Sequence, residues 1–461
     1  MLYVICYMLY IILDGKRYRP VRMICQKNKI KISFYRQMKD YCYSKRNRSK
    51  KYFKLGAYYC MKHIIFIGDG MADFNIPELN GKTPLGYACI PHMDFLAANG
   101  EIGMVKTVPD GFPPGSDVAN LSIMGYDPRK YYTGRSPLEA ASMGIDLGPE
   151  DVAFRCNLVT LSEEGGYEEK TMVDYSSDEI TSKESGALIR DVNTRLGSSD
   201  LHFHAGFGFR HLLVWENGPT GVKLTPPHDI SGKVIGPYLP QGEGSETLLG
   251  FMKKSNEILS GHQVNRKRLA AGLRPGNSVW FWGQGKKPAV KKFHDKFGLE
   301  GSVISAVDLI KGIGICADLE VATVEGVTGT VKTNFKGKVE ACLDELKKGR
   351  DFVYLHVEAP DAAGHRGELE TKLKAIEMVD EMLGMLLKGL EQFTDYKILL
   401  LPDHPTPLSI MTHTTAPVPF AVYAKGQPRK NKITTYHEEA AEKSGLFFPV
   451  GHELIDYFIR G

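Results

Sequence analysis

Residues 63–70 read His-Ile-Ile-Phe-Ile-Gly-Asp-Gly, a short apolar run that stops at an aspartate between two glycines. A short, unbroken apolar run bounded by glycine is typical of a strand that is buried on both faces of a parallel sheet. We therefore expect a strand over residues 63–67 whose carboxyl end carries Asp69.

The same arrangement recurs in the last third of the chain. Residues 352–357 (Phe-Val-Tyr-Leu-His-Val) run towards Asp361, and residues 397–401 (Lys-Ile-Leu-Leu-Leu) run towards Asp403. A helical period covers residues 368–393 between them, and residues 418–423 form one more strand pattern. Strands that alternate with helices predict a doubly wound α/β sheet, which binds ligands at the carboxyl ends of its strands.

The middle of the chain has a different pattern. Short alternating stretches such as residues 154–160 and 210–215 are accompanied by helical patterns over 178–196 and 245–262. This mixture predicts an inserted α+β domain.

We place this insert at residues 135–290, where a Pro- and Gly-rich exit follows. The first domain, residues 61–134 and 291–461, is then discontinuous in sequence. Its two connections to the insert, near 130–138 and 288–300, are the expected hinges.

Charge separates the first 60 residues from the rest. They hold 15 Lys and Arg against 2 Asp and Glu, whereas the remainder carries a net charge of −9. The formal charge of +4 therefore reflects the leader. An acidic body argues against nucleic acid as the main partner.

The leader, residues 1–60, allows three interpretations. Its apolar residues 1–13 are too short to span a bilayer and lack a preceding basic segment, and residues 45–54 are strongly basic. We favour a disordered or wrongly assigned extension with the true start at Met61. A basic arm for a membrane surface or nucleic acid and a membrane anchor are the alternatives.

The cysteines indicate a reducing compartment. Cys89, Cys156, Cys316 and Cys342 lie outside the leader, form no CxxC pair and have mostly apolar neighbours. We expect buried thiols and not disulfides, and hence a cytoplasmic protein without a membrane segment.

Three carboxylates are predicted to meet at one edge of the main sheet. Asp69, Asp361 and Asp403 each follow an apolar strand. Carboxylates gathered in this way repel one another unless cations neutralise them. The sequence therefore predicts a metal site.

Histidines add nitrogen ligands to this set. His365 lies one helical turn after Asp361, His404 follows Asp403 directly, and His413 lies nearby in sequence. The Asp-x-x-x-His spacing alone carries little weight, since roughly 1.6 such pairs arise by chance at this composition. Together, mixed Asp and His ligands suit Zn or Mn better than Ca.

Ser116 begins another apolar-periodic stretch, residues 118–124, and is predicted to be a helix N-cap. An ordinary cap is the most frequent role for serine there. The same geometry also favours a bound phosphate, and a metal beside it would lower the pKa of the hydroxyl and make it a nucleophile.

Seven segments, taken together and in order, carry a family resemblance. They are GDGMAD (68–73), PPGSDVANLSIMGYDP (113–128), YYTGRSPLEAASMGIDL (131–147), FRCNLVTL (154–161), HVEAPDAAGH (356–365), PDH (402–404) and HTTAPVP (413–419). Residues 62–461 resemble the archaeal-type, cofactor-independent phosphoglycerate mutases of the alkaline phosphatase superfamily. Some members of this group have been proposed to be homoserine kinases.

The resemblance implies two divalent metal ions. Asp361, His365 and His413 match the ligands of one ion. Asp69, Ser116, Asp403 and His404 match the ligands of the other, and Ser116 also matches the phosphorylated nucleophile. Manganese is the expected metal, with Mg, Co or Zn as alternatives, and the oligomeric state stays open.

A phosphoglycerate carries a phosphate and a carboxylate, which Arg and Lys bind best. The candidates for substrate binding are Arg155, Arg210, His211, His228, Asp229 and Lys311. A solvated strand face is the alternative for the two arginines, and Asp229 is a candidate general base.

The resulting hypothesis is interconversion of 3-phosphoglycerate and 2-phosphoglycerate through a phosphoserine, without 2,3-bisphosphoglycerate. The partner is then a small phosphorylated acid. One alternative is a phosphatase or a homoserine-kinase-like enzyme, although no Walker or protein-kinase motif is present. The other is a metal-binding protein without catalysis.

Overall fold

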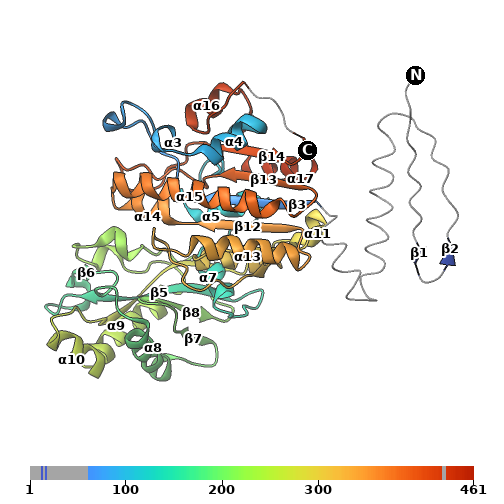
Figure 1. Ribbon diagram of the computed structural model, residues 1–461. Helices are drawn as coiled ribbons and strands as arrows, with labels where there is room; N and C mark the ends of the chain where they lie inside the picture. Colours follow the sequence, from blue (N-terminus) through green and yellow to red (C-terminus); the bar gives the residue numbers. More distant parts are fainter. Residues whose placement is uncertain (1–11, 14–15, 18–60, 428–431) are drawn as a thin grey trace, which may run out of the picture. The chain divides into compact units, whose positions relative to one another are not determined.

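The computed structural model describes residues 12–13, 16–17, 61–427 and 432–461 (Figure 1). Within the first 60 residues it describes one antiparallel pair, β1 (Ile12–Leu13) with β2 (Lys16–Arg17). The three interpretations of the leader otherwise lie outside the described residues.

The main sheet has eight strands in the order β11-β10-β12-β3-β13-β14-β4-β15. Their bounds are β3 Lys62–Gly68, β4 Glu101–Val105, β10 Gly301–Ile304, β11 Glu320–Val321, β12 Phe352–Val357, β13 Tyr396–Leu401, β14 Val418–Ala424 and β15 Phe447–Phe448. The predicted α/β core is confirmed. The sheet is mixed, because β14 runs antiparallel to both of its neighbours.

Strand β3 lies between β12 and β13 and is parallel to both. Its alternate residues enter two separate cores: Ile64 and Phe66 pack on one face, and Ile65 and Ile67 pack on the other. Burial on both faces explains the unbroken apolar run.

Helices cover both faces of this sheet (Figure 1). One core includes α4 (Pro91–Asn99), α13 (Phe335–Lys347) and α15 (Leu369–Leu390). The other includes α5 (Ser116–Ile123), α12 (Asp308–Cys316) and α17 (Leu454–Arg460). The helical period over 368–393 is thus confirmed as α15.

A second sheet contains five antiparallel strands, ordered β6-β5-β8-β7 with β9 paired to β5. The strands are β5 Val152–Leu161, β6 Met172–Asp174, β7 Leu201–His204, β8 Arg210–Trp215 and β9 Ser278–Lys286. Helices α8 (Ser182–Leu196) and α9 (Ser245–Ser260) contribute Leu188 and Leu248 to its core.

All ten residues of β5 are buried. The solvated strand face given as the alternative for Arg155 is therefore wrong. The strand is covered on both faces, because Phe154 packs with the core of α8 and α9 while Ala153 packs against Ala140 of α7 (Ser136–Ser142).

Short helices make up the remaining elements. They are α3 Pro84–Tyr87, α6 Pro128–Tyr131, α10 Gln263–Ala270, α11 Phe293–Phe297, α14 Ala359–His365 and α16 Glu438–Lys443, with 3-10 turns at Pro77–Leu79, Tyr167–Glu169, Pro227–Ile230, Gly236–Tyr238 and Gly451–Glu453. None of the helices in the described part of the chain is long and apolar enough to cross a membrane.

The cysteines outside the leader are free thiols. Cys156 and Cys342 are buried, as predicted, and burial raises the pKa of both. Cys316 is half-buried. Cys89 is exposed, which contradicts the prediction, because it follows the four-residue helix α3 at the surface.

A buried ion pair anchors α15 to the loops that follow β3 and β13. The Lys372 ammonium donates to Asp73 Oδ2 at 2.7 Å and to the Thr406 carbonyl at 2.8 Å. Both charged side chains are almost completely buried. Burial lowers the pKa of Lys372.

Lys372→Met is expected to lower the free energy of unfolding by about 3–5 kcal/mol, because it leaves the Asp73 charge buried without its cation. Equilibrium denaturation measures the change. Lys374→Met, two residues along the same helix and exposed, is the matched control and should stay within about 0.5 kcal/mol of wild type. Equal effects of the two substitutions would show that the ion pair does not matter for stability.

Candidate active site

Asp69 directly follows β3, and Gly70 allows the chain to turn there. Gly70 has a φ of 63°, and a Cβ at this position would lie 2.7 Å from the Asp361 Cα. Both observations require glycine. The Gly-Asp-Gly sequence therefore delivers a carboxylate and lets the Asp361 helix approach it closely.

Asp403 is held by three donors at the end of β13. Its Oδ1 accepts from the Gly70 N–H at 3.2 Å and from the His404 N–H at 2.9 Å. Its Oδ2 accepts from Asn120 Nδ2 at 2.7 Å. The side chain is completely buried, so its orientation is fixed by these bonds.

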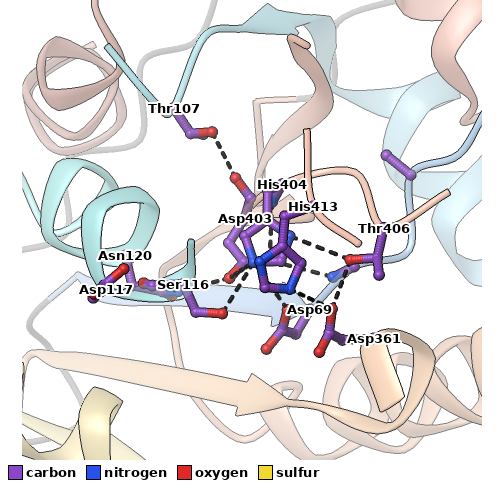
Figure 2. A network of polar contacts seen from close by, with 12 residues as sticks. Asp69, Thr107, Ser116, Asp117, Asn120, Asp361, Asp403, His404, Thr406 and His413 are labelled. Atoms are coloured by element: carbon purple, nitrogen blue, oxygen red, sulfur yellow. Dashed lines mark hydrogen bonds and ion pairs between the residues drawn. The ribbon is translucent and has the colours of Figure 1, made fainter. Parts of the chain in front are cut away.

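His404 lies between the serine and the carboxylates. Its Nε2 is 3.0 Å from Ser116 Oγ, 3.3 Å from Asp403 Oδ2 and 3.7 Å from Asp69 Oδ1. Figure 2 shows Ser116, Asp69, Asp361, Asp403, His404 and His413 converging on this point.

Asp361 and two histidines form the second part of the cluster. Helix α14 begins at Ala359, two residues after the end of β12, with Pro360 in its first turn, and it places Asp361 and His365 on one helical face. The Asp361 carboxylate lies 3.4 Å from His365 Nε2 and 3.2 Å from His413 Nε2. The two ring nitrogens are 2.8 Å apart. Asp361 lies one helical turn before His365, as its spacing predicted, but in the first turn of α14 and not at the end of β12 itself.

Ser116 is the first residue of α5, with Gly115 in the cap position. The N-cap prediction was therefore off by one residue. Ser116 is partly exposed, and its carbonyl accepts from Asn120 Nδ2 at 2.8 Å. Ser116 thus lies in the first turn of the helix, where the positive end of the helix dipole favours a phosphate.

The carboxylates of the cluster are buried close together, so the charge on each one affects the ionisation of the others. Burial, with Asp403 and Asp361 nearby, raises the pKa of Asp69 well above its ordinary value. Burial also opposes ionisation of Asp361, but the hydrogen bond from His413 and the adjacent imidazoles hold the pKa of Asp361 below its ordinary value. Bound cations would reduce the repulsion between these carboxylates.

The donor atoms fit divalent metal ions. Asp69 Oδ1 is buried and has no hydrogen-bond partner among the described residues. Three groups of acids and histidines have one ligand atom each within 4.8 Å of the others: Asp361 with His365 and His413, Asp69 with Asp361 and His404, and Asp69 with His356 and Asp403. Carboxylate and imidazole donors of this kind suit Zn and Mn.

The candidates for substrate binding lie on the second sheet, on the 3-10 turn Pro227–Ile230 and on α12. Arg155 is buried, pairs with Glu139 at 2.5 Å, and lies 5.1 Å from the Trp282 ring centroid. His228 packs on the same Trp282 ring at 5.2 Å. Arg155 and His228 thus share one aromatic neighbour.

Arg210 is exposed and lies over the Phe209 ring. His211, the next residue of β8, points to the opposite face of the sheet, since side chains alternate along a strand. It is buried, and its Nδ1 accepts from the Gly206 N–H at 3.0 Å. The structure therefore does not bring His211 together with Arg210.

Asp229 and Lys311 are the remaining candidates. Asp229 lies 3.7 Å from His228 and is exposed. Lys311 pairs with Asp308 at 3.1 Å on α12. Neither side chain has a recorded contact with the cluster around Ser116 among the described residues.

Four residues of the site were missed from sequence. Asn120 bridges Ser116 and Asp403, and its Oδ1 accepts from the Tyr354 hydroxyl at 2.5 Å. Thr406 donates to Asp361 Oδ1 at 2.6 Å. His356 lies 3.1 Å from Asp69 Oδ2. The available signal was the polar residues Tyr354 and His356 at alternate positions of an otherwise apolar strand.

Sequence comparisons identify the relatives of this chain. A family model for 2,3-bisphosphoglycerate-independent phosphoglycerate mutase matches residues 97–265, and a model for type I phosphodiesterase / nucleotide pyrophosphatase matches residues 248–407. A probable 2,3-bisphosphoglycerate-independent phosphoglycerate mutase from Geobacter sulfurreducens is 52% identical over 400 residues, covering 87% of this chain and 100% of that protein. The chain belongs to this mutase family.

As a member of the family it is an isomerase. The 2,3-bisphosphoglycerate-independent phosphoglycerate mutase of Methanosarcina barkeri is 47% identical over 403 residues, with 87% of this chain and 100% of that protein covered. A Pyrococcus horikoshii protein of known structure has a TM-score of 0.73 at 32% identity, covering 87% and 97% of the two chains. The cofactor-independent phosphoglycerate mutase of Thermoplasma acidophilum, at 24% identity, 87% and 99% coverage and a TM-score of 0.59, shares the fold.

Proposed function

We propose that this enzyme interconverts 3-phosphoglycerate and 2-phosphoglycerate through a phosphoserine at Ser116. The observation that carries the proposal is one partly exposed hydroxyl, on the first turn of a helix, 3.0 Å from His404 and beside a buried cluster of carboxylates and imidazoles. The family of the chain supplies the substrate class.

Two divalent ions would complete this site, and manganese is the metal that we favour. Asp361, His365 and His413 are the proposed ligands of one ion, and Asp69, Ser116, Asp403 and His404 those of the other. Bound ions of this kind neutralise clustered carboxylates and lower the pKa of an adjacent hydroxyl. Asp69 Oδ1, buried without a hydrogen-bond partner among the described residues, supports the assignment.

The chemistry then consists of two phosphoryl transfers. Ser116 Oγ attacks phosphorus, the bond from phosphorus to the glycerate 3-oxygen breaks, and the serine proton ends on the departing oxygen. The second transfer returns the phosphoryl group to the 2-hydroxyl and the proton to Ser116. Asn120 Nδ2 fixes the positions of Ser116 and Asp403 relative to each other, because it donates to the Ser116 carbonyl and to Asp403 Oδ2.

Residues 135–290 are the proposed substrate-binding domain. Arg155 Nε is buried without a hydrogen-bond partner among the described residues, and Arg210 is exposed, so both offer donors to an anionic glycerate. His211, His228, Asp229 and Lys311 stay within this proposal. Closure at the connections near 130–138 and 288–300 would exclude water from the phosphoserine.

We also propose a cytoplasmic location, since the free thiols of Cys156 and Cys342 fit a reducing compartment.

Metal removal tests the proposed function. Enzyme stripped with a chelator should fall below about 1% of its mutase activity in a coupled assay on 3-phosphoglycerate, because the carboxylates again repel one another and the hydroxyl loses its activation. Mn, Mg, Co and Zn are then restored in turn, without 2,3-bisphosphoglycerate, and Mn should recover the most activity.

Parallel assays separate the alternatives. Release of inorganic phosphate without 2-phosphoglycerate would indicate a phosphatase, and phosphohomoserine formed from ATP and homoserine would indicate a kinase. Full mutase activity in stripped enzyme would contradict the two-metal proposal.

A further inference from the structure

The hydroxyl of Tyr354 is buried beside a residue that contacts the reactive serine. Tyr354 is the third residue of β12 and has no exposed surface. Its ring packs in the core that also contains Leu121 of α5, and its hydroxyl lies 2.5 Å from Asn120 Oδ1. A phenylalanine would fill the same space without a polar atom to bury, so packing alone does not explain the hydroxyl.

The direction of each hydrogen bond at Asn120 follows from its neighbours. The Ser116 carbonyl can only accept, so the amide atom that lies 2.8 Å from it is the nitrogen Nδ2. The amide oxygen of Asn120 consequently faces Tyr354. Because this oxygen carries no hydrogen, the Tyr354 hydroxyl must donate to it.

Asn120 also donates to Asp403. Its Nδ2 lies 2.7 Å from Asp403 Oδ2, and Asn120 itself has no exposed surface. The nitrogen end of the amide is thus held by two acceptors, and the oxygen end is held by Tyr354. Without the Tyr354 hydroxyl, the oxygen would be buried with no donor among the described residues, and the orientation of the amide would be less strongly fixed.

The network joins three elements of the site. Tyr354 is on β12, and Asp403 follows β13. Both Asn120 and Ser116 belong to α5. Strand β3 separates β12 from β13 in the sheet, so the Asn120 side chain provides a connection between Tyr354 and Asp403 that the strand pairing does not.

We propose that Tyr354 is a positioning residue whose hydroxyl orients the Asn120 amide and, through it, Asp403. The inference rests on the proposed function, in which Asp403 is a metal ligand and Ser116 is the nucleophile. Asn120 holds the Ser116 carbonyl with the same nitrogen, so the orientation of its amide sets the distance between nucleophile and ligand. The alternative is that the Tyr354 ring only fills the core and that its hydroxyl does not affect the site.

Tyr354→Phe separates the two roles, because it removes the hydroxyl and keeps the ring. At saturating Mn²⁺ its kcat for 3-phosphoglycerate should fall about 10-fold, while KM stays within about two-fold of wild type, because the hydroxyl acts on the nucleophile and its metal ligand and not on substrate binding. Calorimetric titration of the stripped full-length chain with Mn²⁺ should still show two ions, one of them bound about 3–10-fold more weakly.

Tyr436→Phe is the matched control. Tyr436 also has no exposed surface, and its hydroxyl donates to the Pro419 carbonyl at 2.9 Å. Each substitution removes one buried hydrogen bond, so a general loss of stability would affect both proteins alike. Tyr436→Phe should leave kcat and both Mn²⁺ affinities within about two-fold of wild type. Equal losses in the two variants, or no loss in Tyr354→Phe, would overturn the inference.

A double substitution tests whether the effect passes through Asn120. Asn120→Leu removes a partner of Asp403 and should weaken one ion about 10–100-fold. Adding Tyr354→Phe to it should cause no further loss of kcat or affinity, since the amide that the hydroxyl orients is gone. A further loss as large as that in the wild-type background would contradict this route. Wild type that binds no Mn²⁺ would instead overturn the proposed function, so the two failures are distinguishable.

Discussion

Ser116→Ala should lower mutase activity by at least about 10⁴-fold, the scale of loss seen when an enzyme nucleophile is removed. The proposed route forms a bond between Ser116 Oγ and phosphorus, and the described residues place no second hydroxyl at the start of α5 within hydrogen-bond distance of His404 Nε2. The measurement is the initial rate of 2-phosphoglycerate formation from 3-phosphoglycerate.

The matched control is Ser122→Ala in the same helix. The Ser122 hydroxyl is buried and has no hydrogen-bond partner among the described residues, so its loss should leave the rate within about two-fold of wild type. Mass spectrometry of quenched wild-type enzyme should show an added phosphoryl group on the peptide that contains Ser116. Substantial mutase activity in Ser116→Ala would exclude the covalent route.

Asp361→Asn should remove one of two bound ions and lower activity by more than about 100-fold. The Asp361 carboxylate contacts His413 at 3.2 Å, His365 at 3.4 Å and Thr406 at 2.6 Å, so it is central to its half of the cluster. Loss of an outer partner of a ligand already weakens metal binding by about 10–100-fold, and loss of a ligand charge should exceed that.

Metal content per chain, measured by elemental analysis after dialysis, is compared with activity for this variant. Glu370→Gln is the control, since it removes one exposed carboxylate from the nearby helix α15 without touching the cluster. Two tightly bound ions in Asp361→Asn would assign Asp361 a role other than ligand. Equal losses in both variants would point to net charge as the cause.

The main sheet was accessible from sequence because its strands are buried on both faces. Residues 63–67 form an unbroken apolar run. A short run of this kind that ends at a glycine is typical of a buried parallel strand. The ends of these predicted strands then gave the positions of Asp69 and Asp403. Asp361 was placed at the end of its strand, whereas it lies in the short helix α14 that begins at Ala359. The apolar pattern does not reveal that helix, although the spacing of Asp361 and His365 indicated a helical turn.

The second sheet was harder to predict because its central strand is buried in an unexpected way. Residues 154–160 alternate in sequence, yet α7 covers the face that alternation assigns to solvent. Such coverage depends on contacts between distant segments, which periodicity does not encode. Grouping His211 with Arg210 was a separate error, because adjacent residues of a strand face opposite sides of the sheet.

The supporting residues of the site were missed for a related reason. Tyr354 and His356 contact Asn120 and Asp69 across 234 and 287 residues of sequence. Their alternate positions in an otherwise apolar strand were a local signal, but that signal does not identify their partners. Only the sheet order, which places β12 beside β3, gives them a partner.

Anomalous diffraction from crystals soaked in Mn²⁺ tests most directly whether these residues form a two-metal centre. The account predicts two peaks, about 3.5–4 Å apart. One should lie among Asp361, His365 and His413, and the other among Asp69, Asp403 and His404 beside Ser116. A single peak, or peaks away from these side chains, would contradict it.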